Sequence, residues 1–521
     1  MSNSHPILMC GYAAVAASIS IAQPITIPIF SGDQSPGPIP LTPDWWSQLG
    51  GSSSHTGSSQ TPQTSGVHLS SPNWITTGDG SLTLSFTPQS GVVADNMRVY
   101  AVGFDEQFDQ YIAAFDQDSG ELAWATESPF SLLDSWSMPS IDTGNNTIIL
   151  GTGFSVIALD RFSGDLQWTT SLNTPIVNAS PCVTEDLGGT DRVFITDYSF
   201  SSGANGSLIC INVDPTSPVN QYVPGDIVWT VQLPGDCSGN TPAYHDGVVY
   251  VSTADDGFGG PGHLLAFDAT TTSAPSPIWD TPNPQPHGFY SAVTYDDDFI
   301  YASSYNFAGL QRSANTVKLD ADTGLVVWSV PTVRTDASPL VLQNGKILVS
   351  GGVPTSPSTL FTGSLPAIEL IEDLGKSAVV LWDSFEDTHN DLDQSGTWDQ
   401  GEPFLSIGGW GHHPIAFISQ RKAKLLVGTM SPPSGFNPFT HASGLHTIDL
   451  SKHPTDPGFI ISSQPNAGNT PALVGNSIYT TSSTGLSAMT LHSTPQPLPL
   501  IERIRTLIDG PIPTGAFKPT P

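Results

Sequence analysis

The chain has 521 residues, of which 38% are hydrophobic and only 12% are charged, and it contains 50 glycines and 46 prolines. Helix-rich proteins carry more exposed Glu and Lys than this, so the composition favours many short strands joined by turns. The 47 acidic residues against 15 Lys and Arg give a net charge of −32, which repels phosphate backbones and anionic lipid and argues against nucleic-acid and membrane-surface partners.

The N-terminal segment 1–22 resembles a signal peptide. Residues 7–21 form an uncharged, mostly apolar run that is short for a membrane span, and Ser20 and Ala22 supply small residues at a cleavage site. No Lys or Arg precedes the run, so an ordinary disordered N-terminus is the alternative. We expect cleavage, a linker over residues 23–43, and a secreted or periplasmic monomer without a transmembrane span.

Cysteines say little about the compartment. Cleavage would remove Cys10 and leave Cys182, Cys210 and Cys237. One disulfide with one free thiol fits these three positions, and so do three buried unpaired thiols.

A repeated hairpin pattern begins near residue 111. Three segments read YIAAFDQDSGELAW (111–124), SVIALDRFSGDLQW (155–168) and NTVKLDADTGLVVW (315–328). In each, an apolar strand reaches an Asp, a turn ends in Gly, and an alternating strand ends in Trp, which is the period-two pattern of a β-hairpin. We expect the carboxylates to cap the turns and the glycines to supply positive φ. These residues are Asp116, Asp160, Asp320, Gly120, Gly164 and Gly324.

Tryptophans close six successive units, at Trp124, Trp168, Trp229, Trp279, Trp328 and Trp382. Their spacing of roughly 45 to 60 residues fits one four-stranded β-propeller blade with variable loops. A seventh unit spans 414–462 without a closing Trp, and an eighth begins at residue 469. The outermost strand of the eighth unit is expected from the N-terminal stretch 66–77, because that pairing closes the ring and removes exposed strand edges.

These observations predict an all-β fold, an eight-bladed β-propeller of four-stranded antiparallel blades over residues 44–491. Seven blades are the alternative. A Pro-rich tail, residues 492–521, follows the ring.

The repeated unit resembles the PQQ-like β-propeller repeat, in which x-P-x-V-x, a turn and V-Y-V precede A-x-D-x-x-T-G-x-x-x-W. That family includes eight-bladed quinoprotein dehydrogenases and non-enzymatic propellers, among them an outer-membrane assembly lipoprotein. The stretch WWSQLGGSSSHTG (45–57) also resembles the segment that often precedes the first blade in this family. The shared residues define blade packing, so the resemblance implies the fold and does not choose among functions.

One function implied by the resemblance is a calcium-dependent quinoprotein oxidoreductase of alcohols or sugars, with PQQ and calcium in the central channel. PQQ is a tricarboxylate and needs cationic side chains, which are scarce here, and the adjacent Cys-Cys pair of many such dehydrogenases is absent. We therefore do not expect PQQ to bind, and we assign no catalytic residue. A non-enzymatic binding or scaffold module with an unknown protein or carbohydrate partner is favoured, and the oxidoreductase is the alternative.

Two adjacent histidines, His412 and His413, precede the seventh unit. Adjacent residues of a strand point to opposite faces, so the two are poorly placed to ligate one metal ion. We expect hydrogen-bonded loop histidines.

The sharpest local signal is DLDQSGTWDQGE, residues 391–402. Oxygen-bearing side chains stand at positions one, three, five, nine and twelve, and Gly stands at position six, which is the spacing of an EF-hand calcium loop. The stretch lies in a connection over about residues 383–413, which is long for a propeller, so we expect a structural calcium that orders it. A solvated acidic turn is the alternative. The predicted ligands are Asp391, Asp393, Ser395, the carbonyl of Thr397, Asp399 and Glu402.

Overall fold

The structure is a computed structural model. It describes residues 45–494 except 59–65, 89, 129–136, 186, 201–203, 255–259, 308–311, 343–344, 355–363, 396–397, 400, 420–421 and 431–440. The expected signal peptide, the linker and the tail beyond residue 494 lie outside the described residues. All described residues belong to one compact unit, Pro43–Pro521. The described part contains a single helical element, the 3₁₀ turn η1 (Leu49–Gly51), and no helix long and apolar enough to span a membrane.

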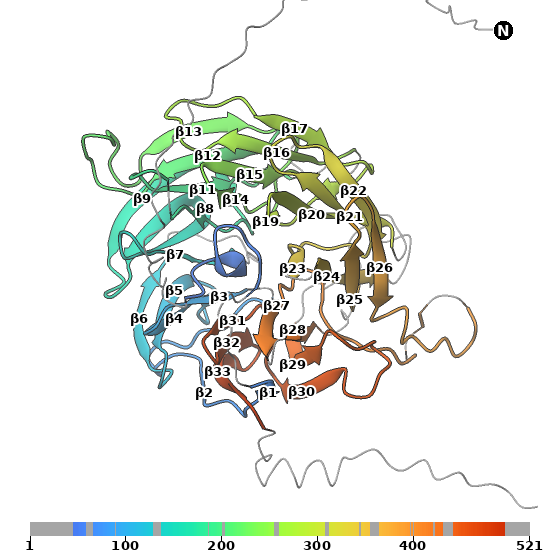
Figure 1. Cartoon of the computed structure of the whole chain (residues 1–521). Coiled ribbons are helices and arrows are strands. Elements are labelled where there is room, and N and C mark those ends of the chain that lie inside the picture. The colour runs from blue at the N-terminus through green and yellow to red at the C-terminus, as the bar shows by residue number, and fades with distance from the viewer. Residues whose placement is uncertain are drawn as a thin grey trace, which may run out of the picture. The chain divides into compact units, whose positions relative to one another are not determined.

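Eight antiparallel sheets form the blades of a β-propeller, which Figure 1 shows in a view along its central axis. The first four blades contain β3 (Val92–Ala94), β4 (Arg98–Phe104), β5 (Gln110–Asp116) and β6 (Leu122–Glu127); β7 (Ser140–Asp142), β8 (Thr147–Asp160) and β9 (Leu166–Ile176); β10 (Cys182–Val183), β11 (Arg192–Thr196), β12 (Ser207–Asn212) and β13 (Ile227–Gln232); and β14 (Ala243–His245), β15 (Val248–Ser252), β16 (His263–Asp268) and β17 (Trp279–Pro282).

The last four blades complete the circle. They contain β18 (Gly288–Phe289), β19 (Thr294–Asp296), β20 (Phe299–Tyr305), β21 (Ala314–Asp320) and β22 (Val326–Thr332); β23 (Leu340–Leu342), β24 (Lys346–Pro354), β25 (Ser364–Asp373) and β26 (Ala378–Asp383); β27 (Ile415–Ser419), β28 (Lys422–Met430), β29 (Ala442–Asp449) and β30 (Ile460–Pro465); and β31 (Ala472–Val474), β32 (Ser477–Ser482), β33 (Gly485–His492), β1 (His68–Leu69) and β2 (Trp74–Thr76).

The predicted eight blades are confirmed, and the alternative of seven is wrong. Innermost strands of successive blades contact one another, from β7 with β10 through β23 with β27, and β31 of the last blade contacts β3 of the first. The second blade contains three strand elements because β8 supplies both of its central strands. The chain changes direction within β8 near Gly153, where φ is 49° and the strand register shifts.

The N-terminal strand closes the ring as predicted. Both β1 and β2 pair antiparallel with β33, with Leu69 opposite Leu491 and Trp74 opposite Ala488. The outer edge of the last blade is therefore covered by a segment more than 400 residues away in the sequence, and this pairing removes an open sheet edge.

The repeated Asp-to-Trp pattern encodes contacts between neighbouring blades. In the second blade, the Asp160 carboxylate accepts bonds from main-chain N–H groups of the turn, and Gly164 has a φ of 78°. A Cβ atom at Gly164 would lie 2.7 Å from the indole of Trp124 in the preceding blade. The indole N–H of Trp124 donates to the carbonyl of Arg161, 3.1 Å away, so each Trp packs beneath the next turn.

The same indole-to-turn bond recurs around the ring. It is made by Trp74 to Gln117, Trp229 to Thr271 and Trp279 to Ala321. Apolar side chains fill the space between adjacent blades, as where Tyr100 and Ile112 pack with Ile141. Burial between blades, about 25 cal/mol per Å² of apolar surface, therefore stabilises the ring as a single body.

Candidate metal centre and the filled central channel

The longest connection between blades is the arm, residues 384–413, which joins β26 to β27 and carries the acidic loop, residues 391–402. Figure 1 shows the arm as an orange loop that leaves the edge of the ring. A long connection without strands stays ordered only where its own polar groups are satisfied. Contacts at its first residues show how the ring holds it.

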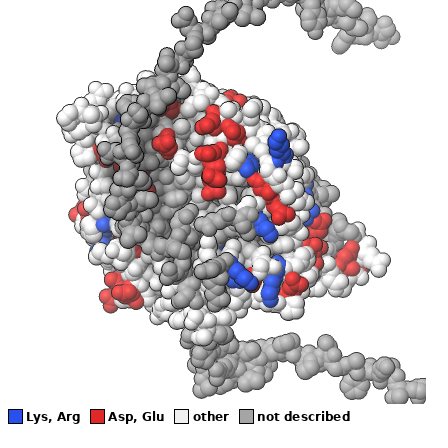
Figure 2. Space-filling view, in the orientation of Figure 1, with Lys and Arg blue, Asp and Glu red and all other residues white. Residues whose placement is uncertain are grey.

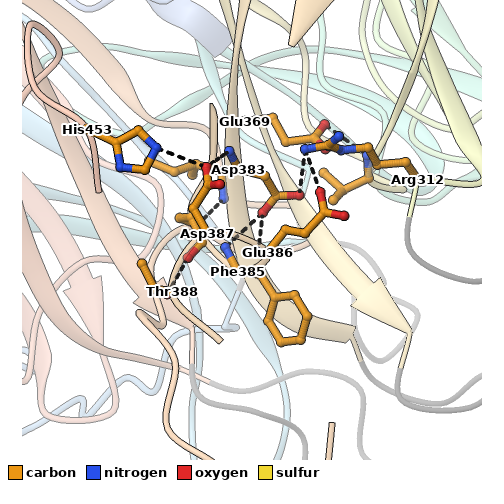
Figure 3. Close-up of polar contacts among 11 residues, drawn as sticks. Arg312, Glu369, Asp383, Phe385, Glu386, Asp387, Thr388 and His453 are labelled. Atoms are coloured by element: carbon orange, nitrogen blue, oxygen red, sulfur yellow. Dashed lines mark hydrogen bonds and ion pairs between the residues drawn. The ribbon is translucent and has the colours of Figure 1, made fainter. Parts of the chain in front are cut away.

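Arg312 binds the root of the arm to the sixth blade (Figure 3). Its Nε lies 2.9 Å from the Oε1 atom of Glu369, and its Nη2 lies 2.8 Å from the Oε2 atom of Glu386 and 3.6 Å from the Oδ2 atom of Asp383. Farther along, His453 of the seventh blade lies 3.3 Å from the Asp387 carboxylate. Arg312 lies between β20 and β21, so side chains of the fifth and seventh blades hold the first residues of the arm.

Two of these carboxyl groups are buried side by side. Glu369 and Asp383 are register partners on β25 and β26, and their exposed fractions are 0% and 2%. Burial raises the pKa of Glu369 well above its usual value, and the nearby charge of Asp383 adds to this effect. Burial also raises the pKa of Asp383. A single guanidinium facing two buried carboxyl groups favours retention of a proton by the pair.

The acidic loop gathers three of its predicted ligands. One carboxylate oxygen from each of Asp391, Asp393 and Glu402 lies within 4.8 Å of the other two. Ser395 and Asp399, also predicted, lie beside each other, with the Ser395 hydroxyl 3.5 Å from the Asp399 Oδ2 atom. Thr397, the remaining predicted ligand, lies outside the described residues.

Main-chain N–H groups hold these carboxylates in place. The N–H of Ser395 donates to the carboxylates of both Asp391 and Asp393. Glu402 accepts bonds from the N–H groups of Asp399 and Leu392, and its Oε2 atom lies 2.9 Å from the His389 imidazole. The Asp399 N–H is the largest cause of a lowered pKa at Glu402, and His389 is the next, so the carboxylate is kept ionised.

Carboxylates held this close repel one another unless a cation lies between them. Calcium prefers six to eight oxygen ligands in an adaptable geometry, which carboxylate, hydroxyl and carbonyl oxygens of one short loop supply. The three converging carboxylates, with Ser395 and Asp399 beside them, therefore fit a divalent cation.

Residues 45–58, here called the plug, run through the centre of the ring, where Figure 1 shows the dark blue segment with η1. Trp46 exchanges two main-chain bonds with Ala94 on β3, of 2.9 and 3.0 Å. The next residue, Ser47, accepts the N–H of Ile141 on β7. The plug thus passes from the innermost strand of one blade to that of the next.

The plug continues this path around the ring. Gln48 is fully buried, and its side chain makes a pair of bonds with the N–H and carbonyl of Val183 on β10. Carbonyl groups of the plug then accept main-chain N–H groups in further blades: Ser53 from Tyr244, Ser54 from Tyr295, and Gly57 from Ala416. Main-chain bonds therefore tie the plug to the first, second, fourth, fifth and seventh blades, and Gln48 ties it to the third.

A cavity of about 10 Å³ remains beside the plug, between Trp46, His55, Ser338 and His413. The Nδ1–H of His55 donates to the carbonyl of Val293, so its Nε2 atom carries a lone pair, for which the described residues offer no partner. Burial lowers the pKa of His55 to about 4, against the effect of that bond. Burial, followed by the nearness of His55, lowers the pKa of His413 to about 3, so both imidazoles are neutral at physiological pH.

The expectation of hydrogen-bonded loop histidines is met by both residues. His412 is 1% exposed, and its Nε2 atom accepts the N–H of Gly428. The Nδ1 atom of His413 accepts the N–H of Ser338, 3.4 Å away. The two side chains serve different neighbours, although both lie in the loop before β27 and not on a strand.

A buried polar cluster that was not predicted from the sequence contains Arg334 and Asp336. Arg334 is fully buried, its Nε donates to the Ser364 hydroxyl, and its guanidinium lies 5.0 Å from the ring centre of Tyr305. Burial raises the pKa of Asp336 to about 7, opposed by a bond from Trp410 and by the charge of Arg334. The signal in the sequence was only the triplet Arg-Thr-Asp before a strand, which is common.

One face of the molecule carries many acidic side chains, and three cysteines lie in its interior. Figure 2 shows Asp and Glu side chains across the upper part and the edges of one face, with the Lys and Arg mostly in the right half beside them. The cysteines Cys182, Cys210 and Cys237 are free and buried, which selects the unpaired alternative for these three residues. Burial raises the pKa of each thiol, so they are unreactive.

Eight closed blades, a central segment hydrogen-bonded to several of them and a Trp–turn contact repeated between blades define the protein as an eight-bladed β-propeller. Residues 74–223 and 219–351, which together span more than half of the chain, match the family described as outer membrane protein assembly factor BamB. The chain belongs to this PQQ-like propeller family, as the sequence resemblance predicted. No curated protein matches the chain by sequence.

Solved structures with the same fold include both kinds of family member. BamB from Moraxella catarrhalis is 14% identical with a TM-score of 0.50, over 80% of this chain and 98% of that chain. A europium-containing methanol dehydrogenase is 12% identical with a TM-score of 0.55, over 84% and 89%. Quinohemoprotein alcohol dehydrogenase ADHIIG from Pseudomonas putida HK5 is 12% identical with a TM-score of 0.52, over 88% and 82%. At these identities the likeness defines the fold and not the activity.

Proposed function

We propose that the protein is a non-enzymatic propeller that works outside the cytoplasm as a binding or scaffold module and is stabilised by calcium. The observation that carries the proposal is the plug, which occupies the centre of the ring with hydrogen bonds to successive blades. A segment that is hydrogen-bonded to so many blades stabilises the ring, which favours a structural role for it. Binding then falls to the faces and edges of the propeller.

The distribution of cations supports the same conclusion. Four of the five buried basic side chains described are engaged away from the channel, where they pair across strands or blades: Arg161 with Asp95, Arg192 with Asn212, Lys318 with Asp373 and Lys424 with Asp449. The fifth, Arg334, is fully buried and lies against the ring of Tyr305. One guanidinium is too few for a tricarboxylate cofactor, which needs several cationic or N–H donors.

The family supports a protein partner. The relative from Moraxella catarrhalis is BamB, and the matching family is described as an outer membrane protein assembly factor. An acidic propeller of this family is suited to a neutral or cationic protein surface, because like charges repel an anionic one. The apolar run of residues 7–21 supports export.

Calcium has a structural role in this proposal. Asp391, Asp393 and Glu402 would hold the ion through carboxylates, with Ser395 and Asp399 beside them. The ion would neutralise their repulsion and order the arm, a contribution that grows with free calcium concentration by mass action. It supplies no chemistry to a substrate.

A pull-down from the extracellular fraction of the source cells, with the mature protein as bait, tests the binding function. A partner retained in a stoichiometric complex is the expected result. A parallel sample receives PQQ and calcium and is assayed with an alcohol or sugar and a redox dye. Dye reduction that depends on PQQ would refute the non-enzymatic proposal.

A second candidate function, a PQQ oxidoreductase, is favoured by one observation. Arg334 and Asp336 lie beside Tyr305 and Trp410, and the pKa of Asp336 is raised to about 7. A carboxyl group with that pKa beside a cation is suited to general-base catalysis. Asp336→Asn would abolish any PQQ-dependent dye reduction if this candidate were correct.

A further inference from the structure

A pocket of about 280 Å³ lies at the seam where the last blade meets the first. It is formed by the loop after β4, by the turn between β32 and β33, and by the segment 77–86 that connects the ring-closing strand β2 to the first blade. This seam pocket is separate from the acidic loop, the root of the arm and the plug. None of the described residues that line it is Lys or Arg.

The floor of the seam pocket is apolar and rigid. It consists of Leu84, Phe86 and Phe104, which are 1%, 4% and 7% exposed. The backbone of Ser85 exchanges two bonds of 2.8 Å with Phe104, so the segment is fixed to the edge of the first blade. The floor therefore offers preformed aromatic and aliphatic surface.

The rim of the seam pocket is acidic. Asp105 and Glu106 both line it, and the Oδ1 atom of Asp105 accepts the N–H groups of Gln107 and Asp109, each at 2.9 Å. These bonds fix the Asp105 carboxylate, and its Oδ2 atom is able to accept a hydrogen bond from a ligand. Glu106 is exposed and has no hydrogen bond or ion pair among the described residues.

We propose that the seam pocket binds an arginine side chain of a protein partner. The methylene stem of the arginine would lie against the small exposed parts of Phe86 and Phe104, because long charged side chains bury their stems on apolar surface. The charged end would meet Asp105 and Glu106 at the rim. The net charge of −32 attracts a basic partner and repels an acidic one.

His441 lines the same pocket and does not oppose the cation. Burial lowers its pKa, so the imidazole is neutral near pH 7. The hydroxyl groups of Thr83 and Ser483 at the rim supply acceptors for remaining guanidinium N–H groups. The inference rests on the proposed binding function and names its partner chemistry.

Titration with Nα-acetyl-arginine amide, followed by saturation-transfer NMR on the full protein, tests the proposal. Nα-acetyl-citrulline amide has nearly the same shape without the charge, and we expect it to bind about tenfold more weakly. The double variant Asp105→Asn with Glu106→Gln should weaken arginine binding about tenfold. The control, Asp118→Asn with Glu121→Gln, removes the same charge from an exposed turn of the same blade and should leave binding unchanged.

Three results would overturn the proposal. Equal binding of citrulline would identify an apolar site, and binding of D-glucose in place of arginine would identify a sugar site. An equal loss in the control variant would show that general charge alone attracts the ligand. If the pull-down partner binds the Asp105→Asn, Glu106→Gln variant as tightly as the wild type, the binding function stands and the seam pocket is not its site. If no partner is recovered but arginine binds here, the pocket stands and the binding function fails.

Discussion

Calcium should raise the melting temperature of the protein, and the double variant Asp391→Ala with Glu402→Ala should abolish that rise. Both carboxylates belong to the group whose oxygens lie within 4.8 Å of one another. Their removal leaves Asp393 as the only member of that group, and one carboxylate does not hold calcium against water. Neither side chain belongs to the apolar core, so the variant should fold.

The expected size follows from mass action. At a free calcium concentration of 100 times Kd, binding to the folded state alone stabilises it by about 2.7 kcal/mol. Unfolding entropy is about 2.1 cal/mol/K per residue, which amounts to roughly 0.9 kcal/mol/K for a ring of about 450 residues. The melting temperature should therefore rise by about 3 °C. Magnesium, which is smaller and holds its water more tightly, should have a smaller effect.

Differential scanning calorimetry in EGTA and in calcium measures the shift, and limited proteolysis reports on the arm itself. Calcium should protect the arm from cleavage in the wild type and not in the double variant. Asp118→Ala with Glu121→Ala, on an exposed turn of the first blade, is the matched control and should respond to calcium like the wild type. The reasoning is refuted if calcium changes neither melting nor cleavage of the wild type, or if it acts equally on the double variant.

Three further perturbations test the packing and charge of the ring. Gly164→Ala places a Cβ against the Trp124 ring at a φ of 78° and should lower the free energy of unfolding in urea by about 2–5 kcal/mol. The control Gly188→Ala, with a φ of 61° and open space around it, should lower it by only about 1 kcal/mol. Equal losses would contradict the contact between blades. Burial holds the pKa of Glu369 well above 4.5, so the folded state retains a proton that the unfolded state loses, and stability should fall as the pH rises above 4.5. In urea midpoints measured from pH 4.5 to 8, Glu369→Gln should reduce this fall. An unchanged pH dependence in the variant would contradict the role of Glu369. Deletion of residues 45–58 should lower the free energy of unfolding by about 5 kcal/mol or more, and an unchanged urea midpoint would show that the plug is dispensable.

The blades were predictable because the contacts between them require particular side chains at repeated positions. Gly164 and Trp124 are spaced by the repeat, and each is needed where it stands, the glycine for its φ of 78° and the indole for its bond to the next turn. Such contacts leave a periodic trace in the sequence. The acidic loop carries a local signal of a similar kind, since calcium requires oxygens at fixed positions of one continuous segment, and calcium binding there stays a prediction.

No periodic or local sequence pattern predicts the contacts of the root of the arm or of the plug. Arg312 and Glu369 are 57 positions apart, and nothing local indicates that they meet. The plug is held mostly through its main chain, as where the carbonyl of Ser53 accepts the N–H of Tyr244, and any residue supplies a carbonyl. Its small residues fit a crowded axis, but small residues are also typical of a linker.

The N-terminal part of the described chain contacts the ring both at its centre and at the outer edge of the last blade, and the second contact has a consequence for folding. Residues 45–58 bind the innermost strands of several blades, and strands β1 and β2 cover the edge of β33, which ends at His492. The second pairing requires nearly the full chain, and contacts of such long sequence separation form late because loop closure opposes them. Until then the last blade has an open edge, and the arm joins two blades of an unclosed ring. Calcium bound at Asp391 and Glu402 would order the arm within its own segment, before the ring closes. Calcium there would therefore stabilise the junction of the sixth and seventh blades before β1 and β2 pair with β33.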